Sequence, residues 1–159
     1  MTDGRQRALR DALGMYATGV AVVTAAGPEQ RPVAMTVNSF ATVSLDPPLV
    51  LWSIQRDVGP FAEFMDADHY AVHVLHAGQQ GAADHFAQSL DDKFAGRQYE
   101  VGPEGLPLLD DFCARFQCGV ERRIPAGDHV ILLGRVLDFE QRPAEPLVFH
   151  AGAYATTRP

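Results

Sequence analysis

Apolar residues gather in short runs along most of the chain, and turn-forming residues separate these runs. Alternation and β-branched content predict strands at residues 20–25, 32–37, 41–45, 48–54, 70–75, 112–124, 129–140 and 146–154. The first four runs follow one another within about 35 residues, whereas parallel neighbours need crossovers of about a dozen residues each. The spacing therefore predicts an antiparallel sheet.

Three other segments carry apolar residues at helical spacing, at 5–16, 58–68 and 79–89. The first is expected to be amphipathic, and residues 96–111, rich in Gly and Pro, are expected to form a long surface excursion of the kind that often covers a site. Frequent strands with helices at only a few points predict a mainly β fold: a small antiparallel barrel with a few peripheral helices. We expect one domain over residues 1–159.

Composition and charge narrow the function classes. The net charge is −7 and the 13 Lys and Arg residues are scattered, which argues against nucleic-acid or anionic-membrane binding. No apolar run reaches the roughly 18 residues of a membrane span, and the first 16 residues lack the features of a signal peptide. A cytoplasmic location is expected. Cys113 and Cys118 are too few for a disulfide framework and are expected to be buried thiols.

Polar residues interrupt the strands at 34–53, which read AMTVNSFATVSLDPPLVLWS. Because side chains alternate between the faces of a strand, Thr36 and Asn38 share one face and Val37 and Ser39 the other, so neither face is cleanly apolar. The segment is either an edge strand with a polar loop or a surface for a planar heteroaromatic ligand with donors and acceptors around its edge.

Three further positions could carry chemistry. His129 follows Gly127 and Asp128 at the start of an apolar strand, where it could contact a cofactor or substrate, donate a proton near neutral pH, or simply follow a hairpin turn. Arg56 could clamp a phosphate, and Lys93 could supply a charge for one. Each is also compatible with an ordinary surface residue.

Several classes of site are disfavoured. His69 and His73 share a strand face but His76 points away, and no acidic partner stands at ligand spacing, so no metal site is expected. The chain has no GxSxG elbow for a nucleophilic serine and no GxGxxG fingerprint of a Rossmann nucleotide fold.

The order of the motifs is more informative than any one of them. TGVAVVTA, MTVNSFATVSLDPPLVLWS, DKFAG, GDHVILLGRV and PLVFHAGAY follow one another over residues 12–154. This order resembles the flavin reductase-like family, the short-chain NAD(P)H:flavin oxidoreductases of two-component monooxygenases. The resemblance implies a split β-barrel with a Greek-key core, a homodimer with flavin near the subunit interface, and FMN or FAD reduced by NADH or NADPH. It also implies a partner oxygenase that receives the reduced flavin.

The resemblance also implies roles for individual residues. Thr36, Val37, Asn38, Ser39 and Thr42 would line the isoalloxazine; Ser53, Ile54 and Arg56 would approach the ribityl chain and phosphate; Lys93 would lie near the phosphate with Phe86 packed beside it; and Tyr154 would lie close to the flavin or dinucleotide. His129 would lie on the nicotinamide side and help place NAD(P)H, because the flavin itself carries the redox chemistry.

The sequence departs from the family pattern at two places. A basic residue is common where Ala153 or Ala155 stands, which bears on dinucleotide or phosphate affinity, and His73 replaces a usual Asn, a change expected to be structural. Similar barrels include electron carriers that hold FMN tightly without free-flavin turnover, and a barrel for another ligand or only a partner protein is a third interpretation.

Overall fold

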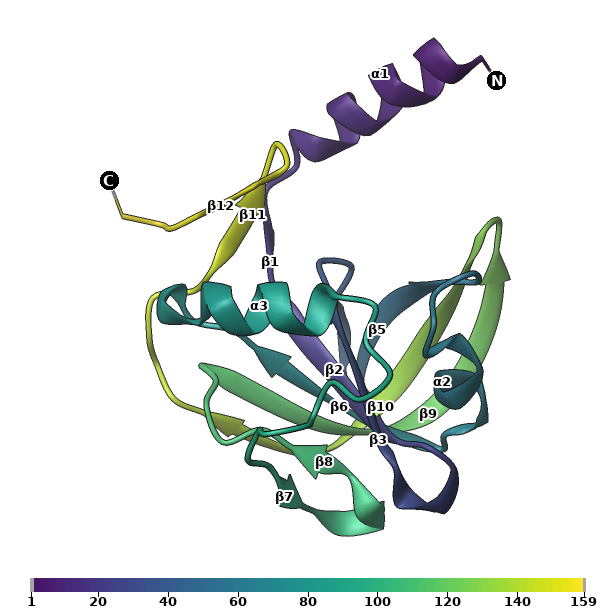
Figure 1. Cartoon of the computed structure of the whole chain (residues 1–159), viewed down its shortest axis with the longest axis vertical. Coiled ribbons are helices and arrows are strands. Elements are labelled where there is room, and N and C mark those ends of the chain that lie inside the picture. The colour runs from purple at the N-terminus through teal and green to yellow at the C-terminus, as the bar shows by residue number, and fades with distance from the viewer. Residues whose placement is uncertain (1, 159) are drawn as a thin grey trace.

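The computed structural model describes residues 2–158 (Figure 1). Most of its elements lie where they are predicted, but the strand expected at 146–154 is two short antiparallel strands joined by a turn. The helices are α1 (Asp3–Gly14), α2 (Phe61–Asp66) and α3 (Gln80–Ala87). The strands are β1 (Thr18–Gly19), β2 (Ala21–Ala26), β3 (Pro32–Val37), β4 (Ala41–Leu45), β5 (Pro48–Gln55), β6 (His69–Val74), β7 (Glu100–Val101), β8 (Pro107–Leu108), β9 (Ala114–Ala126), β10 (His129–Gln141), β11 (Val148–His150) and β12 (Ala153–Ala155).

One seven-stranded sheet, with strand order β3-β2-β6-β9-β10-β5-β4, forms the body of the molecule. Every neighbouring pair is antiparallel, as predicted. The two edge strands, β3 and β4, are consecutive in the chain and are joined only by residues 38–40. A connection this short spans at most about 14 Å, so the sheet curls until its edges approach without pairing. This is a split barrel, and the return of β6 beside β2 and of β10 beside β5 is a Greek-key arrangement.

Apolar side chains of alternate residues fill the inside of the curled sheet. Trp52 on β5 is fully buried there and meets the edge of Phe64 from α2, with ring centroids 5.0 Å apart. The principal members of this inner core are Val23, Val37, Trp52, Ile54, Phe64, Tyr70, Val72 and Leu132. Helix α2 therefore supplies a plug for the barrel, as its apolar spacing at Phe61, Phe64 and Met65 indicates.

A second core lies on the outer side of β2 and β3, where α3 packs. Val22 and Ala34 project from these strands toward Ala83 and Phe86 of α3, and Phe94 follows the helix into the same cluster. Helix α3 is thus fixed against β3, with the Thr36 hydroxyl donating to the Ala83 carbonyl at 2.6 Å.

The expected surface excursion at 96–111 is only partly exposed. Leu106, Leu108 and Leu109 are buried, and Thr24 on β2 donates its hydroxyl to the Pro107 carbonyl at 2.6 Å. The prediction of a surface segment is therefore wrong for its second half, because its leucines bury apolar area against the barrel.

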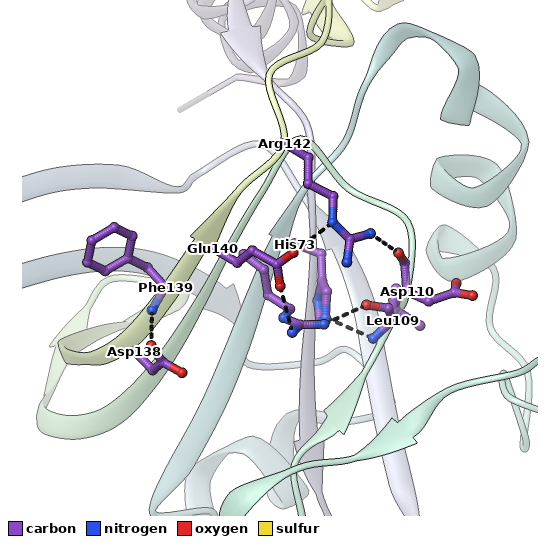
Figure 2. Close-up of polar contacts among 8 residues, drawn as sticks. His73, Leu109, Asp110, Asp138, Phe139, Glu140 and Arg142 are labelled. Atoms are coloured by element: carbon purple, nitrogen blue, oxygen red, sulfur yellow. Dashed lines mark hydrogen bonds and ion pairs between the residues drawn. The ribbon is translucent and has the colours of Figure 1, made fainter.

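His73 attaches this segment to the barrel. Its Nδ1 donates to the Val22 carbonyl at 3.1 Å. Its Nε2 accepts from the Leu109 amide at 3.0 Å, as Figure 2 shows. Arg115 donates to the Leu109 carbonyl, and Arg142 donates to the Asp110 carbonyl and to Glu140. Both His73 ring nitrogens are thus occupied by the backbone, which gives this residue a structural contact and leaves it no lone pair for a metal.

Helix α1 stands away from the barrel and leaves its apolar residues uncovered. The three-stranded sheet β1-β11-β12 lies between the helix and α3, and the Ala151 amide donates to the Gly14 carbonyl (Figure 1). Leu13 is 66% and Tyr16 79% exposed, so the amphipathic helix is confirmed as a helix but has no apolar partner within residues 2–158. No helix in this range is long and apolar enough to cross a membrane.

The close approach of Gly134 on β10 to Tyr70 on β6 yields a stability prediction. A Cβ at Gly134 would lie 2.0 Å from the Tyr70 hydroxyl and 3.2 Å from the Cys118 Cβ. We expect Gly134→Ala to lower the free energy of unfolding by about 1–3 kcal/mol, because the buried ring has no room to move. Urea denaturation measures this value.

The matched control is Gly119→Ala on the neighbouring strand β9, where the new Cβ would meet Leu137 at 3.7 Å and His69 at 3.9 Å. These are ordinary contacts, so a change of at most about 0.5 kcal/mol is expected. Equal stability of the two variants would contradict the packing described for Tyr70.

His73 makes the stability of the fold depend on pH. Burial lowers its pKa from 6.5 to about 3, so the unfolded chain binds a proton below about 6.5 that the folded chain refuses. Stability is then lost as the pH falls from about 6.5 toward 3. Between pH 7.5 and 5.0 we expect His73 to contribute a loss of at most about 2 kcal/mol.

His73→Asn, which has no titrating ring, is expected to remove this component. Urea denaturation of both proteins at the two pH values gives the comparison. An identical loss in wild type and variant would show that another group is responsible.

Candidate functional site

An open groove of about 470 Å³ runs along β3, between the loop that precedes α2 and the segment that follows α3. Its walls are residues 31–36, 57–60, Glu63, 86–91 and Lys93. Of the predicted site residues, Thr36, Phe86 and Lys93 line this groove. The Phe86 ring itself is buried between α3 and the strands β2 and β3. The residue therefore forms the floor of the groove and offers no exposed stacking surface.

Lys93 is bound to the backbone on both sides of the groove. Its half-buried ammonium donates to the Ala34 carbonyl on β3 and to the Phe86 carbonyl on α3, each at 2.9 Å. Burial lowers the pKa of Lys93. Two of its three N–H groups are therefore occupied, and at most one remains for the predicted phosphate.

Glu63 gives the groove an acceptor that sequence reasoning missed. Its Oε2 is buried without a hydrogen-bond partner, and the guanidinium of Arg31 lies 4.0 Å from the other carboxylate oxygen. A buried polar atom without a partner is costly unless a ligand or water supplies one. Oε2 itself is out of reach of the groove, but Glu63 lines the groove and its side chain is 22% exposed. The groove thus presents a carboxylate to a ligand that offers hydroxyl or N–H donors, and no periodicity in the sequence singles out a helical glutamate for this role.

Two polar residues, Ser39 from the connection between β3 and β4 and Ser53 from β5, meet near the C-terminal end of β5. The Ser53 amide donates to the Ser39 hydroxyl at 3.0 Å, and that hydroxyl donates to the Ser53 carbonyl at 3.1 Å. A side chain from the 38–40 connection thereby occupies the place of a strand neighbour. Asn38, next to it, is exposed.

The register between β5 and β10 sets the position of His129 relative to Ser53. Ser53 pairs with Ile131, and Gln55 pairs with His129. Directly paired residues of antiparallel strands point to the same face, and that face is opposite to the one that buries Trp52 and Ile54. His129 and Ser53 therefore share the outer face, about 7 Å apart along the strands.

Two neighbours hold His129 in place. Its Nδ1 lies 2.7 Å from the Asp128 carboxylate, and because a carboxylate only accepts, the Nδ1 atom carries the proton. This contact lowers the pKa of Asp128. Arg56 donates its backbone N–H to the Asp128 carbonyl at 3.0 Å and its Nε–H to the Gly127 carbonyl at 3.2 Å. The His129 side chain remains 41% exposed, so Nε2 is open to a ligand.

Four predicted site residues have side chains that lie away from the face with Ser53 and His129. Val37 and Ile54 point into the inner core, so only their backbones could face a ligand. Thr42 is opposite Val50 on the other face of the sheet and is exposed. Tyr154 packs against Phe149 in the C-terminal sheet, where burial and a contact with the Asp84 carboxylate raise its pKa. Within one chain, none of these side chains joins the group around Ser53 and His129.

The chain matches the model of the flavin reductase like domain over residues 13–158. The chain belongs to this family. An FMN reductase (NADH) of Agrobacterium fabrum is 45% identical over 93% of the chain and 84% of its own length. A solved NADH:FAD oxidoreductase of Streptomyces globisporus, in complex with NAD and FAD fragments, has a TM-score of 0.90 at 39% identity and covers 100% of this chain and 97% of its own.

Some relatives of this flavin reductase-like chain are much longer. The reductase component of a flavin-dependent trigonelline monooxygenase from Acinetobacter baylyi is 40% identical over 94% of the chain but over only 48% of its own length. The chain thus spans about half the length of some curated relatives that it matches.

The contacts of Lys93 yield a prediction that separates its two roles in this family member. Lys93→Met removes both carbonyl contacts, so we expect the free energy of unfolding to fall by about 1–3 kcal/mol. If the ammonium also meets a flavin phosphate, FMN affinity falls more than riboflavin affinity, since riboflavin has no phosphate. Urea denaturation and flavin fluorescence titrations measure the two effects. Unchanged stability would contradict the structural contact.

Proposed function

We propose that this chain is an NAD(P)H-dependent flavin reductase that transfers hydride to FMN or FAD and supplies reduced flavin to a partner monooxygenase. The named relatives favour NADH as the donor. The observation that carries the proposal is the meeting of two groups at the end of β5: the hydroxyls of Ser39 and Ser53, and the imidazole of His129. The groups suited to the polar edge of a flavin and the group suited to a nicotinamide thus lie near one another at the end of β5.

The role that we propose for each residue follows from the hydrogen-bond donors and acceptors that it offers. The Ser53 hydroxyl and Asn38 meet the polar edge of the isoalloxazine, while the groove with Thr36, Glu63 and Lys93 takes the ribityl chain and its phosphate. The flavin supplies the redox chemistry when it is bound. His129 presents Nε2, which is an acceptor while the ring is neutral, to the dinucleotide and fixes its approach. The remaining predicted residues, Val37, Ile54 and Thr42, contribute backbone or rim contacts.

A homodimer is the proposed assembly. Apolar side chains that a single chain leaves uncovered include Leu9, Leu13, Met15 and Tyr16 on and after α1, and Leu137 and Phe139 at the far end of β10. Large exposed apolar side chains grouped on one element, as on α1, are typical of interaction sites. A second copy would cover it and would wall off an open groove that one chain leaves in solvent. Tyr154 would then act from the partner's side of the interface.

The chain is proposed to act as one domain in the cytoplasm. Cys113 and Cys118 are free thiols, which suits a reducing compartment.

Anaerobic stopped-flow mixing tests the function directly. The protein with one equivalent of FMN or FAD is mixed with NADH or NADPH, and flavin absorbance is followed. We expect rapid bleaching that repeats over many equivalents of free flavin. Flavin that binds but stays oxidised would contradict the proposal and favour an electron carrier; absence of any flavin binding would favour a barrel for another ligand.

His129→Ala tests the position of the nicotinamide. We expect the KM for the dinucleotide to rise about tenfold or more, since a polar contact of about 1.5 kcal/mol is lost, while the Kd for flavin changes less than twofold. His69→Ala at the start of β6, which pairs with Gly119 of β9, is the control. Equal losses of flavin and dinucleotide affinity would overturn the assignment.

A further inference from the structure

Arg56 precedes Asp57 of the groove wall and contacts the turn before His129, and these contacts assign it a role that the family resemblance does not give. Resemblance places this residue at the flavin phosphate. In the structure its nearest polar contacts are instead two consecutive carbonyls, those of Gly127 and Asp128, in the turn between β9 and β10.

This turn is a two-residue hairpin turn, closed on one side by the Ala126–His129 pair of β9 and β10. Gly127 has a left-handed φ of +63°, and residues 126–128 are all exposed. Gln55 and His129 form the last register pair between β5 and β10, so strand pairing ends at the histidine. The backbone N–H of Arg56 extends the β5–β10 ladder by one bond, to the Asp128 carbonyl. The Nε–H of its side chain adds a second bond, to the Gly127 carbonyl.

The Asp128 carboxylate then links the turn to the ring. Arg56 fixes the carbonyls of Gly127 and Asp128, and the side chain of Asp128 accepts from His129 Nδ1 at 2.7 Å. The orientation of Nε2 therefore depends on where the turn is held. Asp128 is 85% exposed in its side chain, so beyond the hairpin pairing at Ala126 and His129 the contacts with Arg56 are the ones that fix the turn against β5.

We propose that Arg56 is a positioning residue that holds the Gly127–Asp128 turn through its Nε–H and thereby orders the imidazole of His129 for the dinucleotide. This inference rests on the proposed function only in that the ligand of His129 is a dinucleotide. The ordering of His129 itself is a property of the free protein. The Nη groups of Arg56 have no acceptor among the described residues and stay available to an anionic ligand.

Two substitutions separate the hydrogen bond of the Arg56 Nε–H group from the charge of the guanidinium. In Arg56→Gln, the amide nitrogen stands where the Arg Nε stood, so a donor to Gly127 is kept and the charge is lost. In Arg56→Lys, a methylene stands at that position, so the charge is kept and the donor is displaced. Arg122→Lys, an exposed residue on β9 without a contact to the turn, is the control.

The first readout is NMR of the free protein, without flavin or dinucleotide. His129 is assigned by comparison with His129→Ala, and its ring ¹⁵N shifts and the backbone heteronuclear NOE of residues 127–129 are measured. We expect wild type, Arg56→Gln and Arg122→Lys to show the Nδ1–H tautomer and an ordered turn. Arg56→Lys is expected to show a mixture of tautomers and lower NOE values. An ordered His129 in Arg56→Lys would overturn the proposal, and so would a disordered one in Arg56→Gln.

The second readout is steady-state kinetics. We expect the KM for the dinucleotide to be about fivefold higher in Arg56→Lys than in Arg56→Gln, the effect of one hydrogen bond. A pure phosphate clamp predicts the reverse order, with FMN affinity lost in Arg56→Gln and riboflavin affinity unchanged in both. If the protein reduces no flavin at all, the proposed function fails while the NMR result still decides the role of Arg56.

Discussion

The short connection between β3 and β4 is the constraint on which the site depends. Residues 38–40 join the two edges of one sheet, which brings the edges close without letting them pair. An unpaired edge exposes N–H and C=O groups, and the Ser39 hydroxyl satisfies those of Ser53. A polar side chain is required where an aliphatic one would leave both groups without partners. The Ser39 hydroxyl thus belongs to the geometry of the split as well as to the proposed flavin site.

The same constraint explains why the two halves of the site coincide. The outer face of β5 and β10 is left uncovered, whereas α3 and the 106–109 leucines cover the outer face of β2, β3 and β6. Strand register then places Ser53 and His129 on this open face, and Arg56 ties the His129 turn to β5. Lys93 fixes the groove beside it by joining β3 to α3. Strands hold Thr36, Ser53 and His129, and hydrogen bonds to strands β5 and β3 hold Ser39 and Lys93, which is the arrangement that keeps a reacting pair aligned.

Patterning in the sequence predicted most of the fold, because strand alternation and turn residues are local signals. The positions of β3, β4, β5 and β10 agree closely with expectation. The buried half of the 96–111 excursion was missed because its leucines pack on β2 and β6, which are distant in sequence. Site residues were named by family motifs, but their contacts were not: Lys93 and Arg56 bind backbone carbonyls, and Glu63 lines the groove. Such contacts join segments far apart in the chain, and no periodicity reveals them.

The central claim is that flavin and nicotinamide meet at the end of β5. A ¹H–¹⁵N NMR titration of the protein with FMN, followed by NAD⁺, tests it most directly. We expect FMN to shift the amide signals of residues 36–39 and 53–58, and NAD⁺ then to shift those of Asp128 and His129. Perturbations confined to α1 and the C-terminal strands, with residues 36–58 and 127–129 unchanged, would contradict it.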